Sequence, residues 1–131
     1  MKRATLLLLV WLLSAIDFSK AHETMVFQSA PEEIIRGKPI YLTFAIPSKE
    51  CDPVRVSIFY KTDVDALFKE FKLVSHQGIY RFPIIPEMTV GANFFYYFLI
   101  IECADGKIYG FPPANPKGKP LKIKIVDKVV E

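Results

Sequence analysis

The sequence predicts an all-β domain, a sandwich of about seven to eight antiparallel strands. Three observations predict it. Short runs of β-branched and aromatic residues recur along the chain, with Pro, Gly or Asp between them. Several runs alternate apolar and polar side chains, as strands with one buried face do. The 110 residues from 22 to 131 suit one domain with its own hydrophobic core, and two domains would not fit.

The first residues have the pattern of an export signal. Lys2 and Arg3 precede an apolar run over residues 4–13, and the small residues Ser19 and Ala21 form a cleavage site of the A-x-A type. The apolar run is shorter than the roughly 20 residues of a membrane-spanning helix, so a cleaved signal is favoured over a retained anchor. We expect a periplasmic or secreted protein without a transmembrane segment after cleavage.

These observations divide the chain into a signal peptide, residues 1–21, and a single domain, residues 22–131. Cleavage after Ala21 removes three basic residues and one acidic residue, so the formal charge falls from +3 to +1. Nucleic-acid binding requires Lys and Arg clustered on one face, which a nearly neutral domain does not predict. We therefore expect no nucleic-acid partner.

The predicted strands cover most of the domain. In the second of them, Ile40, Leu42 and Phe44 alternate with Tyr41 and Thr43, which indicates one core face. The strands are predicted at residues 24–28, 39–46, 54–61, 68–74, 79–84, 94–103, 107–111 and 121–126.

Three segments between or within these strands call for separate predictions. Asp105-Gly106 suits a type I′ hairpin, in which both central residues have positive φ. The four prolines within residues 112–120 cannot donate to a sheet, so this stretch is predicted as a loop or a broken edge strand. Segment 64–74 also has apolar residues near helical spacing, with Asp63 placed to cap, so a short helix is an alternative there.

Cys51 and Cys103 are the two cysteines of the chain. In an exported protein an even number of cysteines is most simply paired, and this bridge would close a loop of about 50 residues, worth about 4 kcal/mol. Two free thiols, or a redox or metal site, are the alternatives. No Cys-x-x-Cys is present, and His22 and His76 have no zinc-site spacing. We expect no metal and no cofactor.

Five segments follow one another in a familiar order: 36–40 (RGKPI), 54–61 (VRVSIFYK), 78–86 (GIYRFPIIP), 95–98 (FYYF) and 104–106 (ADG). This order resembles the immunoglobulin-like, early-set type of sandwich module of bacterial exported proteins, similar to the amino-terminal modules of glycogen-branching-type enzymes. The resemblance implies a spacer, a sugar-binding unit or a protein-docking unit, usually attached to a larger domain.

The resemblance also implies a strand arrangement. Strands 54–61 and 94–103 would run antiparallel in one sheet, with the start of one beside the end of the other. Cys51 would then lie beside Cys103, provided that their Cα atoms are within about 7 Å.

Residues 94–101 are apolar on both faces of a predicted strand. If Glu102 faces water, Phe94, Tyr96 and Phe98 share its face, because side chains alternate along a strand. Phe59 would flank this stripe from the neighbouring strand.

Exposed apolar patches mark interfaces, so these four aromatic residues, Phe59, Phe94, Tyr96 and Phe98, are the predicted partner-binding residues. Three interpretations stay open. Segment 112–120 or 64–74 covers the stripe, or the stripe binds protein, a second copy of the chain included, or it forms a platform for a polysaccharide.

No residues form a recognisable catalytic set. Asp63 and Asp65 are too few for a calcium loop, and they favour a solvated turn. His76-Gln77-Gly78 is typical of a surface turn, and His22, as a new amino terminus, is a weak copper ligand alone. Phosphate-binding glycine loops are absent from the sequence. We therefore predict no catalytic residues and no enzyme; a small hydrolase is the third-ranked hypothesis.

The predicted function is an exported, non-enzymatic binding or structural module that docks a partner protein in the cell envelope or outside the cell, through the sheet carrying residues 94–103. The alternative is a carbohydrate-binding module that uses the same aromatic stripe.

Overall fold

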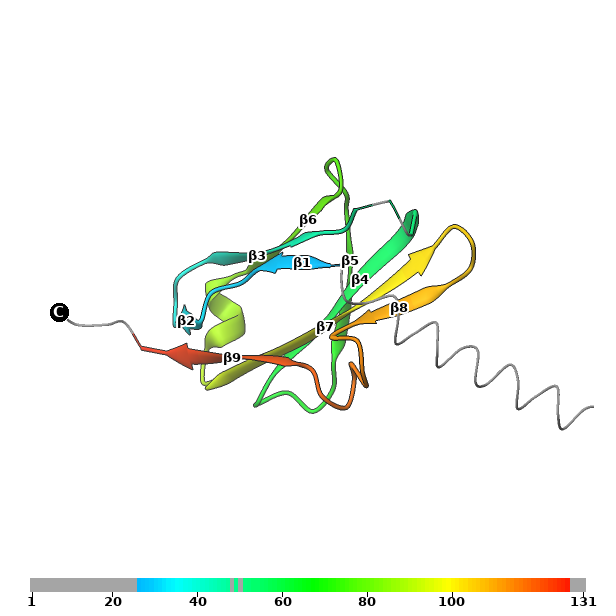
Figure 1. Ribbon diagram of the computed structural model, residues 1–131. Helices are drawn as coiled ribbons and strands as arrows, with labels where there is room; N and C mark the ends of the chain where they lie inside the picture. Colours follow the sequence, from blue (N-terminus) through cyan, green and yellow to red (C-terminus); the bar gives the residue numbers. More distant parts are fainter. Residues whose placement is uncertain (1–25, 48, 50, 128–131) are drawn as a thin grey trace, which may run out of the picture.

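The computed structural model describes residues 26–47, 49 and 51–127. The predicted signal peptide, residues 1–21, and His22 lie outside the described residues. The described chain is all-β, as predicted: strands form two sheets, with one 3-10 turn, η1 (Pro86–Thr89), and no α-helix in the described part. Figure 1 shows the two sheets as two layers, with the carboxyl-terminal strand (red) in the lower one.

Nine strands are present in the described chain, one more than the prediction allowed. They are β1 (Phe27–Ser29), β2 (Glu33–Ile35), β3 (Ile40–Ala45), β4 (Pro53–Thr62), β5 (Lys69–Leu73), β6 (Ile79–Ile84), β7 (Phe94–Cys103), β8 (Ile108–Phe111) and β9 (Leu121–Val126). The additional strand is β2, whose three residues are too short for an alternating pattern to be recognised.

The smaller sheet has the order β1-β3-β6, and the larger one has the order β2-β9-β7-β4-β5, with β8 also paired to β7. All pairs are antiparallel except β2 and β9, which are parallel. The prediction of purely antiparallel strands is wrong at this pair. The long connection from β2 to β9 passes through the rest of the domain, so parallel pairing is sterically possible there.

Strand β7 is the centre of the larger sheet. One of its edges pairs with β4 along nearly its whole length. Its other edge pairs with β9 over Phe94–Tyr97 and with β8 over Leu99–Glu102. Strands β8 and β9 therefore lie end to end beside β7, and the proline-rich chain 112–120 between them leaves the sheet, as the sequence predicted.

The core lies between the sheets and follows the predicted alternation. Phe95, Tyr97, Leu99 and Ile101 of β7 are at most 1% exposed. The Tyr97 hydroxyl donates a 2.7 Å hydrogen bond to the Gln28 side chain of β1, and burial raises the pKa of Tyr97 to about 12. The opposite layer contributes Leu42, Phe44, Tyr80, Phe82 and Ile84 to the same core.

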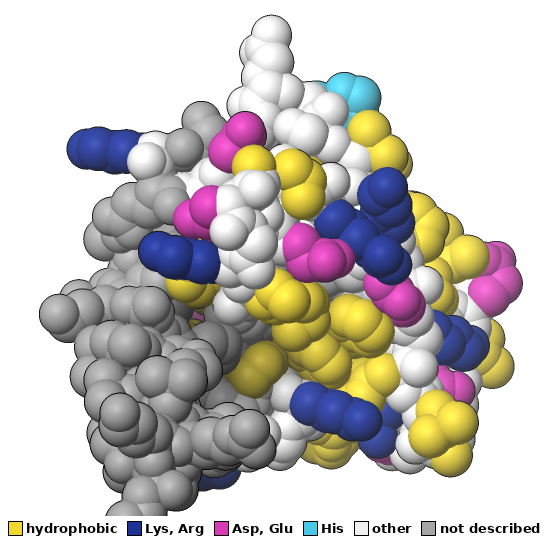
Figure 2. Space-filling view, turned by 90° about the vertical axis from the view of Figure 1, so that its right-hand side faces the viewer, with side chains coloured by type: hydrophobic (Ala, Val, Ile, Leu, Met, Phe, Trp, Pro, Cys, Tyr) yellow, Lys and Arg dark blue, Asp and Glu magenta, His cyan; other side chains and the backbone are white. Residues whose placement is uncertain are grey.

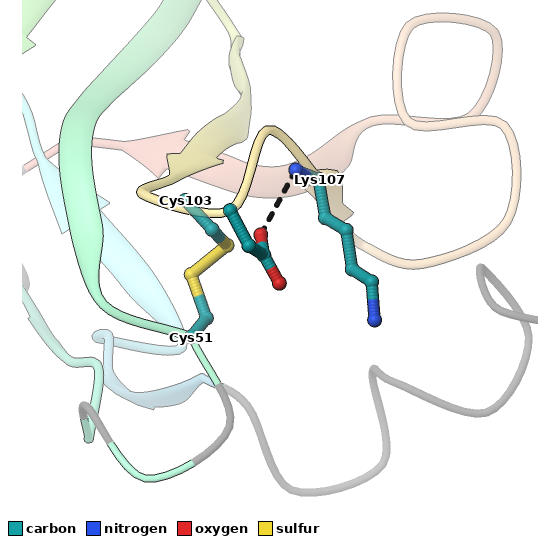
Figure 3. The surroundings of a disulfide bond; sticks show 4 residues. Cys51, Cys103 and Lys107 are labelled. Carbon is teal, nitrogen blue, oxygen red and sulfur yellow. Dashed lines mark hydrogen bonds between the residues drawn. A yellow bond between two sulfur atoms is a disulfide. The ribbon is translucent and has the colours of Figure 1, made fainter.

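The predicted disulfide is confirmed. Cys51 precedes β4 and Cys103 ends β7, their Cα atoms are 5.3 Å apart, and both residues are buried. Figure 3 shows the bridge at the base of the β7–β8 hairpin. The antiparallel arrangement of β4 and β7 places the start of one strand beside the end of the other, which is the arrangement that the pairing needs.

The hairpin turn differs from the predicted type I′. The Gly106 amide donates to the Cys103 carbonyl and the Cys103 amide donates to the Lys107 carbonyl, so residues 104–106 form the loop. Gly106 has φ +89°, whereas Asp105 does not have positive φ. Asp105 instead accepts a 3.0 Å hydrogen bond from the Lys107 amide. A three-residue loop requires only one left-handed residue, which glycine supplies.

The helical alternative for segment 64–74 is wrong, because β5 occupies Lys69–Leu73 and pairs with β4. Asp63 does not cap a helix. Its Oδ1 accepts hydrogen bonds from the Asn93 and Phe94 amides, 2.8 and 3.1 Å long, and so ties the end of β4 to the start of β7. These two backbone donors lower the pKa of the Asp63 carboxyl.

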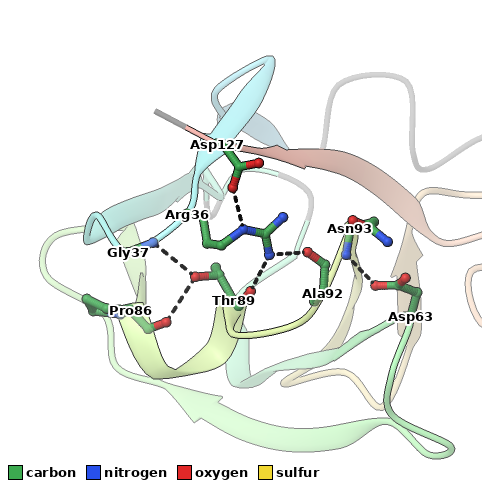
Figure 4. Close-up of polar contacts among 8 residues, drawn as sticks. All are labelled: Arg36, Gly37, Asp63, Pro86, Thr89, Ala92, Asn93 and Asp127. Carbon is green, nitrogen blue, oxygen red and sulfur yellow. Dashed lines mark hydrogen bonds and ion pairs between the residues drawn. The ribbon is translucent and has the colours of Figure 1, made fainter. Parts of the chain in front are cut away.

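Arg36 holds one end of the sandwich together (Figure 4). Its Nε lies 2.9 Å from an Asp127 carboxylate oxygen, just after β9. One of its terminal nitrogens donates to the carbonyls of Thr89 and Ala92, on and after η1. The Gly37 amide adds a 3.2 Å hydrogen bond to the Thr89 hydroxyl. One side chain thus connects the end of β2, the 3-10 turn and the end of β9.

Candidate functional site

The outer face of the larger sheet, opposite to the core, carries the predicted stripe. Because β4 and β7 are antiparallel and in register, their outward side chains form cross-strand pairs. In order along the two strands, the pairs are Lys61 with Tyr96, Phe59 with Phe98, Ser57 with Ile100, and Arg55 with Glu102.

The centre of this face is an aromatic cluster. The rings of Phe59 and Phe98 are stacked, with centroids 4.9 Å apart and an interplanar angle of 9°. Phe68, from the β4–β5 connection, meets Phe98 edge-on at 5.0 Å. Phe98 is only 4% exposed although its side chain points away from the core. These two neighbours therefore bury Phe98 in a small hydrophobic layer outside the sandwich.

A groove of about 680 Å³ lies over this cluster. Its floor consists of Phe59, Phe98 and Ile100, with Lys61 beside them. One wall is the β4–β5 connection with Ala66, Leu67 and Phe68, and the other is the proline-rich loop with Asn115, Pro116 and Lys117. Figure 2 shows hydrophobic side chains gathered on one face of the molecule, with basic and acidic side chains around them.

Gly110 explains why the proline-rich loop folds onto the sheet. Gly110 is on β8, where it pairs with Ile100 of β7. A Cβ at position 110 would be 2.7 Å from Pro116 Cγ. Only a residue without a Cβ permits this contact, because real carbon atoms do not approach so closely. The missing side chain thus sets the position of the second wall.

Two lysines lie over aromatic rings at one end of the face. Lys61 Nζ is 5.2 Å from the Phe68 ring centroid and 5.8 Å from that of Tyr96. Lys122 Nζ is 4.6 Å from the Phe94 ring centroid. All three contacts have the geometry of cation–π interactions, so the ammonium groups stay close to the apolar surface.

The other end of the face carries a charge cluster. Arg55 lies 2.8 Å from a Glu70 carboxylate oxygen and 3.6 Å from one of Glu102. The Ser57 hydroxyl donates a 2.8 Å hydrogen bond to the same Glu70 oxygen. The Ser57 hydrogen bond and then Arg55 lower the pKa of Glu70. Both carboxylates therefore already have a cationic partner within the chain.

The structure divides the four predicted binding residues into two pairs. Phe59 and Phe98 line the groove, whereas Phe94 and Tyr96 are half-buried neighbours with ring centroids 6.4 Å apart, beyond the groove lining. Leu67, which is 79% exposed, and Lys117 also line the groove, and no pattern in the sequence predicts either of them as part of the site. Both are in connections without a periodic pattern, and the position of the β4–β5 connection depends on the contact of Phe68 with Phe98, 30 residues further along the chain.

The other candidate residues from the sequence, His76 and Asp65, make structural contacts in turns. His76 is exposed and forms a bridge with Ile79 around a turn in which Gln77 and Gly78 have positive φ. Asp65 accepts hydrogen bonds from the amide and hydroxyl of Thr62. Within the described residues, no group of three or more His, Cys, Asp or Glu could hold a metal ion. Over the same ranges, no helix has the length and apolar character to cross a membrane.

Comparison with known proteins finds likeness in structure alone. No protein-family model matches the chain, and no curated protein matches its sequence. Two solved structures of variants of superoxide reductase (neelaredoxin) from Ignicoccus hospitalis are similar, each with a TM-score of 0.55 and 12% sequence identity. The matches cover 83% and 82% of this chain, and 86% and 85% of those chains. At this identity the likeness concerns the fold.

This comparison corrects the prediction that the chain is not an enzyme. Both of these similar structures are of a superoxide reductase, an enzyme, so the fold is one on which catalysis occurs. The prediction was wrong because it rested on the lack of a catalytic pattern in the sequence. A sandwich can hold an active site whose residues come from separate strands and loops and have no common motif.

Proposed function

We propose that this chain is an exported binding module that docks a partner protein, in the cell envelope or outside the cell, through the outer face of its larger sheet. The proposal includes a cleaved signal peptide at residues 1–21 and a sandwich of the immunoglobulin-like, early-set type. The observation that carries it is the groove over Phe59 and Phe98, in which an apolar floor lies between two loop walls.

The composition of the groove supports protein docking. Large apolar side chains at the centre and polar or charged groups at the edge are the usual arrangement of a protein interface. Leu67 is 79% exposed and lines the groove together with Phe68 and Phe98, so its apolar surface is continuous with that of the floor. A partner that covered Leu67 would remove its apolar surface from water.

The geometry favours protein over polysaccharide. Sugar platforms need aromatic faces turned to solvent, but Phe59 and Phe98 turn their faces to each other. The rings of Tyr96 and Phe94 already carry lysine ammonium groups over them. The four predicted aromatic residues are therefore engaged within the chain, and the carbohydrate-binding alternative loses its main contact.

The test is affinity capture from native envelope and culture fractions, with the tagged chain produced from its full-length sequence as bait. We expect one protein to be retained, and retained equally in excess cell-surface polysaccharide. Leu67→Asp should abolish the capture, because it places a carboxylate at the groove wall. Val74→Asp is the matched control, since Val74 is 68% exposed and lies outside the groove lining.

Two results would contradict the proposal. Capture that disappears when polysaccharide is added would favour the carbohydrate-binding module. Capture that Leu67→Asp and Val74→Asp leave equally strong would remove the groove as the binding site.

A further inference from the structure

We infer that the partner presents to this groove an extended acidic segment, in which one or two large apolar side chains are flanked by Asp or Glu. The inference rests on the proposed function and specifies the chemistry of the partner. Three features of the groove support it: the size and rigidity of its floor, its width, and the sign of its unpaired charges.

The floor suits one or two large apolar side chains. A groove of about 680 Å³ lies within the range of sites that hold small ligands, and its central lining is apolar. The stacked rings of Phe59 and Phe98, supported edge-on by Phe68, are already packed together before anything binds. A floor that is formed in advance loses little conformational freedom on binding.

The width suits a single extended chain. The floor spans the two neighbouring strands β4 and β7, and adjacent strands lie about 4.8 Å apart. Residues 66–68 close one side and residues 115–117 close the other. A segment lying parallel to the strands fits between these walls, whereas the broad face of a folded domain would meet the walls first.

The charges of the lining are of one sign. Lys61 and Lys117 are its charged residues, and the lining contains no carboxylate. Within the described ranges, neither lysine forms an ion pair. Lys61 is held over the rings of Phe68 and Tyr96, so its ammonium group stays beside the apolar floor. Unpaired positive charge next to an apolar surface is complementary to an apolar side chain flanked by carboxylates.

The nearby acidic residues do not cancel this positive charge. Glu70 and Glu102 both contact Arg55, and Glu70 also accepts a hydrogen bond from Ser57. Glu70 is the cross-strand neighbour of Phe59 on β5, but it and Glu102 both point toward the shared Arg55, and neither forms an ion pair with Lys61 or Lys117 in the described ranges. The lysines of the groove are left to interact with a partner.

The experiment is selection from a random dodecapeptide phage library on the immobilised full chain. We expect enriched peptides to combine aromatic or large aliphatic residues with Asp or Glu. A synthetic copy of the most enriched peptide, labelled with a fluorophore, then gives dissociation constants by anisotropy. Lys61→Gln and Lys117→Gln should each weaken binding about threefold, because each removes one positive charge from the groove lining. Binding should also weaken in about 1 M salt.

Lys107→Gln and Lys119→Gln are the matched controls, since both lysines are exposed and neither lines the groove. They should leave the dissociation constant unchanged.

A library that yields apolar peptides without acidic residues, or equal effects of all four substitutions, would overturn the inference and leave the docking function standing. A library that yields no peptide, together with native capture that depends on Leu67, would mean a folded partner surface and overturn the inference alone. Failure of both the selection and the native capture would remove the function as well.

Discussion

Phe98 and Phe59 are cross-strand neighbours whose rings are nearly parallel, 4.9 Å apart, on the face of the larger sheet that points away from the core. A side chain that points away from the core would ordinarily be exposed to solvent. Here a cross-strand neighbour and an edge-on ring from the β4–β5 connection bury it almost completely. The sandwich therefore has a second, smaller hydrophobic layer, and the candidate groove is the part of that layer left open.

Phe98→Ala should lower the free energy of unfolding by about 3 kcal/mol, because it removes a buried ring from this layer. Leu67→Ala should change it by less than about 0.5 kcal/mol, because Leu67 is mostly in water. Urea unfolding followed by tyrosine fluorescence measures both. Equal midpoints for the two variants would mean that Phe98 contributes no more to stability than an exposed loop residue, and that the second layer is not packed.

Gly110→Ala should destabilise the fold by about 1 to 3 kcal/mol, because its new methyl group would overlap Pro116 Cγ, 2.7 Å away. Pro116→Ala in the same chain should recover a large part of this loss by removing the overlapping atom. Unfolding of the wild type, both single variants and the double variant gives the coupling energy. Additive effects would show that the loop does not rest on Gly110.

Asp63 should make stability depend on pH in the acidic range. Backbone donors hold its pKa below the ordinary value of 3.8, so the ionised carboxylate stabilises the fold above about that pH. The contribution is lost as the pH falls through the lowered value. Asp63→Asn should therefore reduce the pH dependence of the unfolding midpoint in acid. An unchanged pH dependence in Asp63→Asn would contradict this role of the carboxylate.

Removing the disulfide should cost about 4 kcal/mol, since the bridge joins residues 52 positions apart and restricts the unfolded chain. The double variant Cys51→Ala with Cys103→Ala is compared with the oxidised wild type by urea unfolding. Wild-type protein treated with a reductant under denaturing conditions should refold to a state of similarly reduced stability. A midpoint unaffected by either treatment would show that the native β4–β7 pairing alone fixes this end of the sheet.

Local patterns predicted the strands well, for reasons that particular elements make clear. Strands β3, β6, β7 and β9 alternate or carry long apolar runs, and their observed bounds are within one residue of those expected. Strand β2 was not predicted, because its three residues are too few for a pattern and its partner is β9, at the far end of the chain, with which it pairs in parallel. The hairpin at Asp105-Gly106 was located correctly but its turn type was not, because a glycine at the second position suits both kinds of loop.

The sequence by itself determined the all-β class, the place of most strands, the core face of β7 and the pairing of Cys51 with Cys103, because alternation and cysteine number are local or countable properties. It also indicated that residues 94–101 carry more apolar surface than one buried face requires. Only the tertiary structure decided what covers that surface. The stacking of Phe59 on Phe98 and the approach of Leu67 and Lys117 join segments far apart in sequence, and such contacts leave no periodic signal. The contact of Gly110 with Pro116 is local, but it depends on the path of the proline-rich loop, which has no periodic pattern either.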